Sequence, residues 1–170
     1  MKQSILFCFF FLFCHSVSFG QSADYSKDVA TKESIIHALY EVISGPPEQQ
    51  RDWMRFRNLF LPESRLIPTG KNQQNEFTIR AISPEAYIQM FTTNIKSGFF
   101  EKELHQEVEE YGTIAHVFST YETRESINGA VSNRGINSIQ LYNDGNRYYV
   151  VNIFWCAESM GFTLPSKYLN

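Results

Sequence analysis

The segment "GTIAHVFSTYETRES", residues 112–126, contains a single histidine in a run that alternates apolar and polar residues, as a β-strand does. The ordinary pKa of a histidine side chain, about 6.5, suits general acid–base catalysis. A neighbouring carboxylate would strengthen that role, but Glu122, on the same strand face, lies about 20 Å away along an extended chain. His116 is therefore either a catalytic acid or base in a cavity or, as the sequence favours, a neutral histidine hydrogen-bonded within the sheet.

Other reactive side chains do not converge into a recognisable site. His105, Glu107 and Glu109 alternate along one strand face that reads as solvated, and a metal site needs three or four ligands that converge. Cys156 has no basic neighbour in sequence, so we expect a buried structural cysteine rather than a nucleophile. The sequence has no glycine-rich phosphate loop and no zinc-ligand spacing. It predicts neither a metal site nor a cofactor.

The charge pattern argues against nucleic acid as a partner. The chain has 15 Lys and Arg against 18 Asp and Glu, a net charge of −3, and no basic stripe along any segment. One cluster of basic residues, Arg51, Arg55 and Arg57, is accompanied by Glu48 and Asp52 at helical spacings. Solvated ion pairs therefore explain this cluster better than an anionic ligand does.

The first twenty residues have the layout of a secretory signal peptide. Lys2 precedes an apolar run over residues 5–13, and Ser18 and Gly20 suit the −3 and −1 positions of a cleavage site. The run is about half as long as the roughly 20 residues that span a bilayer, so we expect cleavage and no membrane span in the mature chain. The expected divisions are a signal peptide over 1–20, a flexible arm over 21–30 and one domain over 31–170. The mature protein is then exported, to the periplasm or beyond the cell.

Three helices are expected in the first half of the chain. In "TKESIIHALYEVISGPP" the apolar residues recur with the period of a helix, and the Gly-Pro-Pro at the end stops it. A second helix fits residues 48–60, with aromatic and aliphatic side chains on one side. The third begins with Ser83 as its cap and Pro84 in its first turn, and it ends at Gly98.

Segments of strand character fill much of the remaining chain. They cover residues 64–70, 76–82, 99–112, 113–125 and 135–158. Asp144-Gly145 marks a hairpin turn inside the last of them. Alternation over 99–112 places five polar side chains on one solvated face: Glu101, Glu103, His105, Glu107 and Glu109. Helices followed by consecutive antiparallel strands predict an α+β fold with the helices on one face of a sheet.

Three segments, "RFRNLFLPESRL", "AHVFSTYETR" and "RGINSIQLYNDGNRYYVVNIFW", resemble the nuclear transport factor 2-like superfamily, as does the order of elements from residue 31 to 158. This superfamily includes SnoaL-like polyketide cyclases and ketosteroid isomerases. The resemblance implies that the N-terminal helices close the mouth of a strongly curved, mixed or antiparallel sheet and form a cone. It also implies a homodimer through the outer sheet face, where Tyr121 and Tyr149 are expected. Because this fold hosts many unrelated functions, the resemblance implies a fold rather than a reaction.

The catalytic residues of ketosteroid isomerases carry over only in part. Tyr40 is similar to that family's helical tyrosine, and Trp155 is similar to its pocket tryptophan. Where the family has its acidic base, this sequence has Pro68 and Thr69, and the second acidic position falls near Ser138 or Gln140. Without a pocket carboxylate, the sequence favours binding over proton abstraction next to a carbonyl.

The sequence therefore predicts a cone lined by aromatic and neutral polar side chains, which either form a pocket or fill the cone as core. The candidates are Tyr40, Trp53, His116, Phe118, Ser138, Gln140 and Trp155. One function left open is non-catalytic binding of a small, largely apolar ligand. A second is a SnoaL-like lyase, isomerase or cyclase, with His116 as acid or base and Tyr40 or Gln140 orienting a carbonyl. A third is an interaction module that docks a partner protein on the outer sheet face.

Overall fold

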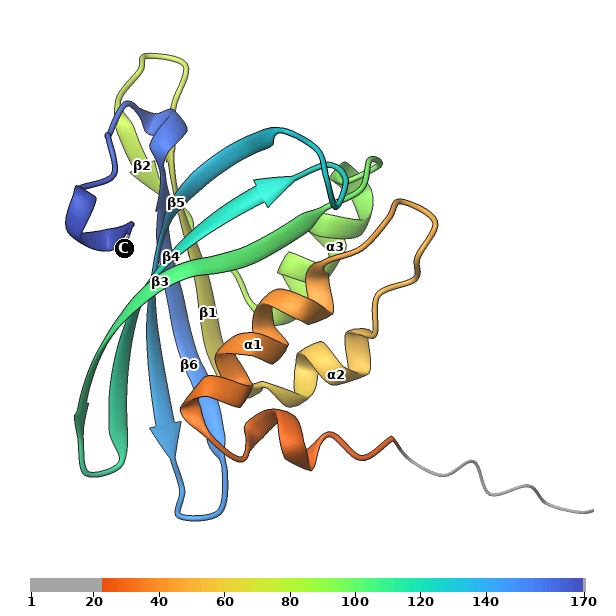
Figure 1. Ribbon diagram of the computed structural model, residues 1–170, viewed down its shortest axis with the longest axis vertical. Helices are drawn as coiled ribbons and strands as arrows, with labels where there is room; N and C mark the ends of the chain where they lie inside the picture. The colour runs from red at the N-terminus through yellow and green to blue at the C-terminus, as the bar shows by residue number, and fades with distance from the viewer. Residues whose placement is uncertain (1–22, 170) are drawn as a thin grey trace, which may run out of the picture.

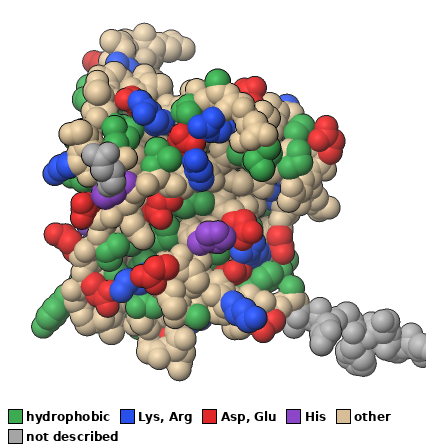
Figure 2. Space-filling model, viewed as in Figure 1, with side chains coloured by type: hydrophobic (Ala, Val, Ile, Leu, Met, Phe, Trp, Pro, Cys, Tyr) green, Lys and Arg blue, Asp and Glu red, His purple; other side chains and the backbone are tan. Residues whose placement is uncertain are grey.

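The computed structural model describes residues 23–169 (Figure 1). The predicted signal peptide, residues 1–20, lies outside this range. Within the range, no helix is long and apolar enough to cross a membrane. Acidic and basic side chains are interspersed over the face seen in Figure 2, with no extended area of one sign.

The three predicted helices are present, and a side chain caps the start of each. The Thr31 side chain accepts a hydrogen bond from the Ser34 amide, and the Ser34 side chain accepts one from the Thr31 amide, which forms a capping box. Asp52 caps the second helix, and Ser83 caps the third, which has Pro84 at its first position. The helices are α1 (Lys32–Ile43), α2 (Trp53–Asn58) and α3 (Pro84–Asn94).

Helix α2 is shorter than the predicted 48–60 because the residues before it form a turn organised by Arg51. The guanidinium of Arg51, which is buried, donates hydrogen bonds to the carbonyl oxygens of Ile43 at 2.8 Å and Gly45 at 2.7 Å. It also donates to the carbonyl oxygens of Gln49, at 2.7 Å, and Pro46. Arg51 is therefore a structural cap for the end of α1 and the following turn, and the expected solvated pairing with nearby acids is wrong for this residue.

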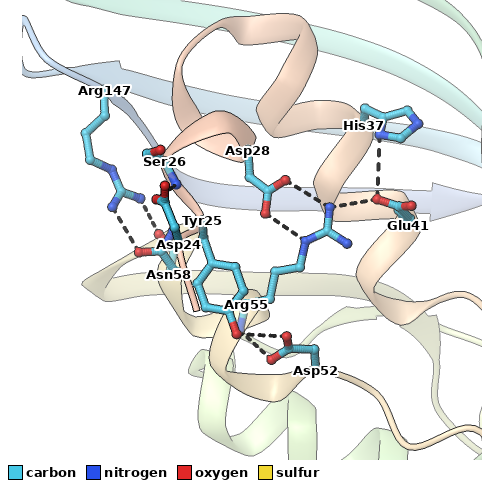
Figure 3. Close-up of polar contacts among 10 residues, drawn as sticks. All are labelled: Asp24, Tyr25, Ser26, Asp28, His37, Glu41, Asp52, Arg55, Asn58 and Arg147. Carbon is cyan, nitrogen blue, oxygen red and sulfur yellow. Dashed lines mark hydrogen bonds and ion pairs between the residues drawn. The ribbon is translucent and has the colours of Figure 1, made fainter. Parts of the chain in front are cut away.

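Residues of the predicted arm pack against α1 and α2 (Figure 3). They form a single 3-10 turn, η1 (Ser26–Val29), whose Val29 is buried. Arg55 of α2 donates two hydrogen bonds to Asp28, at 2.7 and 2.9 Å, and one to Glu41 of α1 at 2.6 Å. The Tyr25 hydroxyl donates to Asp52 at 2.8 Å. These contacts tie this part of the arm to both helices, so it is not loose.

The strands form one mixed sheet of six in the order β2-β1-β6-β5-β4-β3. β1 runs parallel to β6, and every other neighbouring pair is antiparallel. Gly145 has a positive φ of 96° at the predicted hairpin turn, a conformation that glycine adopts without strain. The strands are β1 (Phe60–Lys71), β2 (Phe77–Ile79), β3 (Phe100–Tyr111), β4 (Ile114–Arg124), β5 (Val131–Asn143) and β6 (Tyr148–Ala157).

The two faces of this curved sheet have different covers, as Figure 1 shows. The three helices pack on one face, here called the inner face, and the hydrophobic core lies between them and the sheet. The segment after β6 lies on the other side, here called the outer face. There Tyr168 packs edge to face on Phe118, with ring centroids 5.2 Å apart. The predicted α+β fold, with helices on one face of a strongly curved sheet, is confirmed.

A β-bulge in β3 changes which face its side chains occupy. The pairing register of β3 with β4 shifts between Glu103 and His105. Before the shift, Glu101 and Glu103 pair with residues of β4 that face the helices. After it, His105, Glu107 and Glu109 pair with residues of the outer face. The prediction that all five side chains share one solvated face is therefore wrong, because one extra residue inverts the alternation.

Candidate functional site

A cavity of about 360 Å³ lies between the inner face of the sheet and helices α1 and α3. Most of its wall is apolar and aromatic, including Ile43, Phe91, Ile153 and Trp155. Asn94, an exposed residue in the last turn of α3, lines the cavity too, so the cavity reaches solvent at that end. The volume falls within the range of about 300–1,000 Å³ that is typical of small-molecule sites.

Glu101 brings a carboxyl group into this cavity, although the sequence predicted none there. Its backbone is held at the end of α1, because its amide donates to the Ser44 hydroxyl at 2.9 Å and that hydroxyl donates to its carbonyl at 3.0 Å. Burial raises the pKa of Glu101 to about 8, and a hydrogen bond from Asn137 offsets only part of this. No Lys, Arg or His is among the described residues that line the cavity. Glu101 therefore has no cationic partner in the cavity.

A chain of hydrogen bonds holds the polar end of the cavity in place. Ser119 donates to the Glu103 carboxylate at 2.5 Å, which uses its one hydroxyl proton. Tyr40 must then donate to Ser119, 2.7 Å away, and it accepts from the Asn137 amide at 2.9 Å. Burial, and then the charge of Glu101, raise the pKa of Tyr40. The Tyr40 hydroxyl is thus satisfied inside the protein, and it orients Asn137 beside Glu101.

Tyr121 also faces the cavity, which corrects its expected place on the outer sheet face. Its ring is buried against Gly135 of β5, where a Cβ would stand 2.6 Å from the Tyr121 hydroxyl. Only glycine allows this approach. Burial and the nearby Glu101 raise the pKa of Tyr121, as they do for Tyr87 of α3. Both phenols therefore stay protonated and neutral at the cavity wall.

Three of the predicted ligand-binding residues lie on the helix side of the sheet. Tyr40 and Trp155 line the cavity. Trp53 lies behind it, packed edge to face on Phe56 and Phe91 with ring centroids 5.7 and 5.5 Å away. It lines a shallower cleft on the outside of α2 and α3 instead. Contact of Tyr40 and Trp155 with a ligand stays a prediction.

The other four, His116, Phe118, Ser138 and Gln140, belong to the outer face, so they do not line the cavity. His116 contacts Ser138 through Nε2 at 2.9 Å, and its Nδ1 lies 3.8 Å from an exposed carboxylate, Glu109. In β4 the alternate residues, such as Val117 and Ser119, face the helices instead. Alternation predicted two faces correctly, but the assignment of His116 to the cavity face was wrong. The histidine is hydrogen-bonded within the sheet, the interpretation that the sequence favoured.

A second cavity, of about 310 Å³, lies on the outer face beneath the C-terminal segment. Phe118, Phe154 and Leu164 line it, and Cys156, a half-buried free thiol, does so too. Among residues 23–169, no three His, Cys, Asp or Glu side chains gather closely enough to hold a metal ion. His105 and Glu107, whose spacing along the strand was set aside as a metal site, form a 3.3 Å contact with each other.

The fold is shared with solved structures. Kfla4162 from Kribbella flavida aligns with a TM-score of 0.53 at 6% identity, over 74% of this chain and 86% of that one. The yeast UBP3-associated protein BRE5 aligns with a TM-score of 0.51 at 14% identity, over 74% and 92%. An NTF-2-like protein of unknown function from Silicibacter pomeroyi gives 0.49 at 12% identity, over 74% and 91%. No family model and no curated protein matches the chain. The chain shares its overall fold with Kfla4162 and BRE5, and at these identities the likeness is one of fold alone. The nuclear transport factor 2-like superfamily stays what the resemblance of the sequence implies.

Proposed function

We propose that the cone binds one small, largely apolar molecule whose polar group lies against Glu101. The observation that carries this proposal is the cavity itself, which combines apolar walls with a fixed polar end formed by Glu101, Asn137 and Tyr121. Apolar walls supply affinity, and a few placed polar groups supply orientation. With the signal peptide proposed over residues 1–20, the protein would bind this molecule outside the cytoplasm.

A thermal-shift screen against apolar carbonyl compounds, amines and lipids tests the proposal. A ligand at 100 times its dissociation constant adds about 2.7 kcal/mol of stability, which corresponds to a shift of several degrees for a domain of this size. Trp155→Ala should reduce the shift, because it removes part of the cavity wall. Met90→Ala should do so too, and Met90 lines this cavity alone, whereas Trp155 also lines the cavity on the outer face. His116→Ala is the matched control on the outer face and should leave the shift intact. A shift that is lost in His116→Ala but kept in Trp155→Ala would refute binding in the cone.

Proton-transfer catalysis is a second candidate function, and Glu101 replaces His116 as its acid or base. The specific observation is a cavity carboxyl whose pKa, about 8, lies close to neutral pH, where a general base works best. The test is deuterium exchange at the carbon next to a carbonyl, followed by NMR in heavy water. Exchange should be lost in Glu101→Gln and kept in His116→Ala. Binding without any exchange would leave the cone as a binding site only.

Self-association through the outer sheet face is the third proposal. Ile114, Tyr142 and Phe154 are partly or largely exposed there, at 60%, 37% and 41% of the surface of each residue. Sedimentation equilibrium would show a dimer that dissociates in Phe154→Glu. A monomer at concentrations of 100 μM and above would contradict it.

A further inference from the structure

Glu101 places an ionisable carboxyl group at the polar end of the cavity, and no basic side chain of the described residues lines the cavity beside it. Glu101 and Glu103 both point to the inner face from β3. The other polar and aromatic groups that line the cavity are neutral: Tyr40 from α1, Tyr87 and Asn94 from α3, Tyr121 and Thr123 from β4, Asn133 and Asn137 from β5, and Trp155 from β6. A carboxylate in such a place lacks a counter-ion.

Three basic side chains, on β3, on β4 and after α1, have other partners. Lys102, next to Glu101 in β3, points to the opposite face and pairs with Glu122 at 3.2 Å. Arg124 donates to the same carboxylate at 2.9 Å. The guanidinium of Arg51, which follows α1, donates hydrogen bonds to four backbone carbonyl oxygens. None of these three side chains is therefore available to neutralise Glu101.

Aromatic rings surround this unpaired carboxyl group. Burial and the charge of Glu101 together raise the pKa of Tyr40, Tyr87 and Tyr121, so all three rings lie within its electrostatic reach. The indole of Trp155 closes the wall beside them. Aromatic faces attract cations, most strongly where water is excluded, and cages of aromatic rings are used to bind quaternary ammonium groups.

We propose that the ligand of the cone is an organic cation, an amine or quaternary ammonium on an apolar body, whose positive charge lies between the Glu101 carboxylate and the surrounding tyrosine and tryptophan rings. This rests on the proposed function, that the cone is a binding site. A cationic ligand supplies the counter-ion that the cavity lacks, and its apolar body fills the remainder of the 360 Å³.

The rival ligand is a neutral carbonyl compound, and the two differ in the sign of their pH dependence. A cation pairs with ionised Glu101, so its affinity rises as the pH increases through the pKa of that carboxyl, about 8. A carbonyl oxygen only accepts hydrogen bonds, so a carbonyl compound held by Glu101 needs the protonated carboxyl, and its affinity falls over the same interval. The direction of the change therefore identifies the ligand class.

The experiment is isothermal titration calorimetry of the whole protein at pH 6 and pH 9 with three probes. Benzyltrimethylammonium carries a charge that does not titrate, neopentylbenzene has the same shape with carbon in place of nitrogen, and acetophenone is the carbonyl acceptor. We expect benzyltrimethylammonium to bind roughly 100-fold more tightly at pH 9 than at pH 6, because the ionised fraction of a group of pKa about 8 changes by that factor. It should also bind more tightly than neopentylbenzene at pH 9.

Two variants assign the effect to the cavity. Glu101→Gln keeps the size of the side chain and should remove both the preference for the cation and its pH dependence. Glu109→Gln changes an exposed carboxylate of the same strand on the outer face and should leave both intact. Because the pH dependence is measured on the unaltered protein, the test does not depend on the folding of any variant.

The outcomes distinguish failure of the cationic ligand from failure of the binding site itself. Tighter binding of the cation at pH 9, lost in Glu101→Gln, supports the inference. Equal affinity for benzyltrimethylammonium and neopentylbenzene, or acetophenone binding that weakens from pH 6 to pH 9 without cation binding, overturns the cation and leaves the binding site standing. No binding of any probe at either pH overturns the proposed function, and this inference with it.

Discussion

Two glutamates that lie one rung apart in the same strand pair have opposite environments. Glu101 of β3 pairs with Thr123 of β4, and Lys102 beside it pairs with Glu122. Glu122 is buried on the outer face, where burial alone would raise its pKa, but hydrogen bonds from Arg124 and Lys102 outweigh that and lower it. Glu101, on the inner face, has no cation, and burial raises its pKa.

A cationic partner distinguishes a structural buried carboxylate from a candidate functional one. A protein normally pairs a carboxylate that it buries, as it does with Glu122, because an unpaired buried charge costs several kcal/mol. Glu101 is left without that compensation at the wall of a cavity. Uncompensated groups of strongly shifted pKa gather at functional sites. The inner face is therefore where we place ligand binding, and the outer face is held together by its own pairs.

The largest expected effect comes from Glu101→Gln. The unfolded chain loses the Glu101 proton near pH 4.5, whereas the folded protein keeps it up to about pH 8. Folding stability therefore falls as the pH rises between these values, by roughly 3–5 kcal/mol for the shift involved. Glu101→Gln should remove that fall and be more stable than the unaltered protein above pH 8. Urea unfolding at pH 4, 6 and 9 measures it, and parallel pH profiles for both proteins would contradict it.

The reverse sign is expected for Glu122→Gln. The pKa of Glu122 is lowered in the folded state. Its contribution to folding stability is therefore fully present above the pKa that Glu122 has in the unfolded chain, and it is lost as the pH falls through the pKa of the folded state. The variant should lose about 1–3 kcal/mol at pH 7, since Lys102 and Arg124 are left without their shared partner, and much less at pH 3. Urea unfolding at these two pH values is the check. If the variant is as stable as the parent at pH 7, the ion pairs of Glu122 do not stabilise the fold, and the contrast with the unpaired Glu101 is wrong.

A smaller effect is expected at the hydroxyl that orients Asn137. Tyr40→Phe removes one hydrogen bond to Ser119 and one from Asn137, both buried, and should cost about 1–2 kcal/mol. It should also weaken binding of a cavity ligand, because Asn137 loses its fixed position beside Glu101. Unfolding and calorimetry on the same variant measure the two effects. Lost stability with unchanged affinity would make the hydrogen-bond chain purely structural.

The smallest effect is expected on the outer face. His116→Ala removes a half-buried side chain whose polar partners are Ser138 and, more distantly, the exposed Glu109. We expect a loss of about 1 kcal/mol or less and no change in the affinity of a cavity ligand. Thermal unfolding with and without ligand tests both points. An affinity that depends on His116 would return the catalytic assignment to that residue.

Local signals made much of the fold predictable from the sequence. The apolar stripe of α1, the Ser83 cap of α3 and the Asp144-Gly145 turn all act within a few residues of chain. The strongly curved sheet was expected from the resemblance to a known superfamily. The parallel pairing of β1 with β6 joins segments about 80 residues apart, and no local pattern specifies it.

The candidate site was less predictable, for a physical reason. Strand alternation predicts which residues share a face, but not which face meets the helices, so His116 and its neighbours were placed on the wrong side. In β3 the bulge after Glu103 moved two glutamates inward, and nothing in "EKELHQEVEE" marks the extra residue. Tyr40 and Trp155 were located correctly because the resemblance placed them, whereas Glu101 and Asn137 required the tertiary structure.

The most direct test of the contrast is a pH titration of the glutamate side-chain carboxyl carbons by ¹³C NMR, with Glu101 and Glu122 assigned by their Gln variants. We expect Glu101 to titrate near pH 8 and Glu122 to titrate below the ordinary glutamate value of 4.5. If Glu101 titrates at or below pH 4.5, the cavity carboxylate is already compensated, and the proposed site on the inner face is wrong.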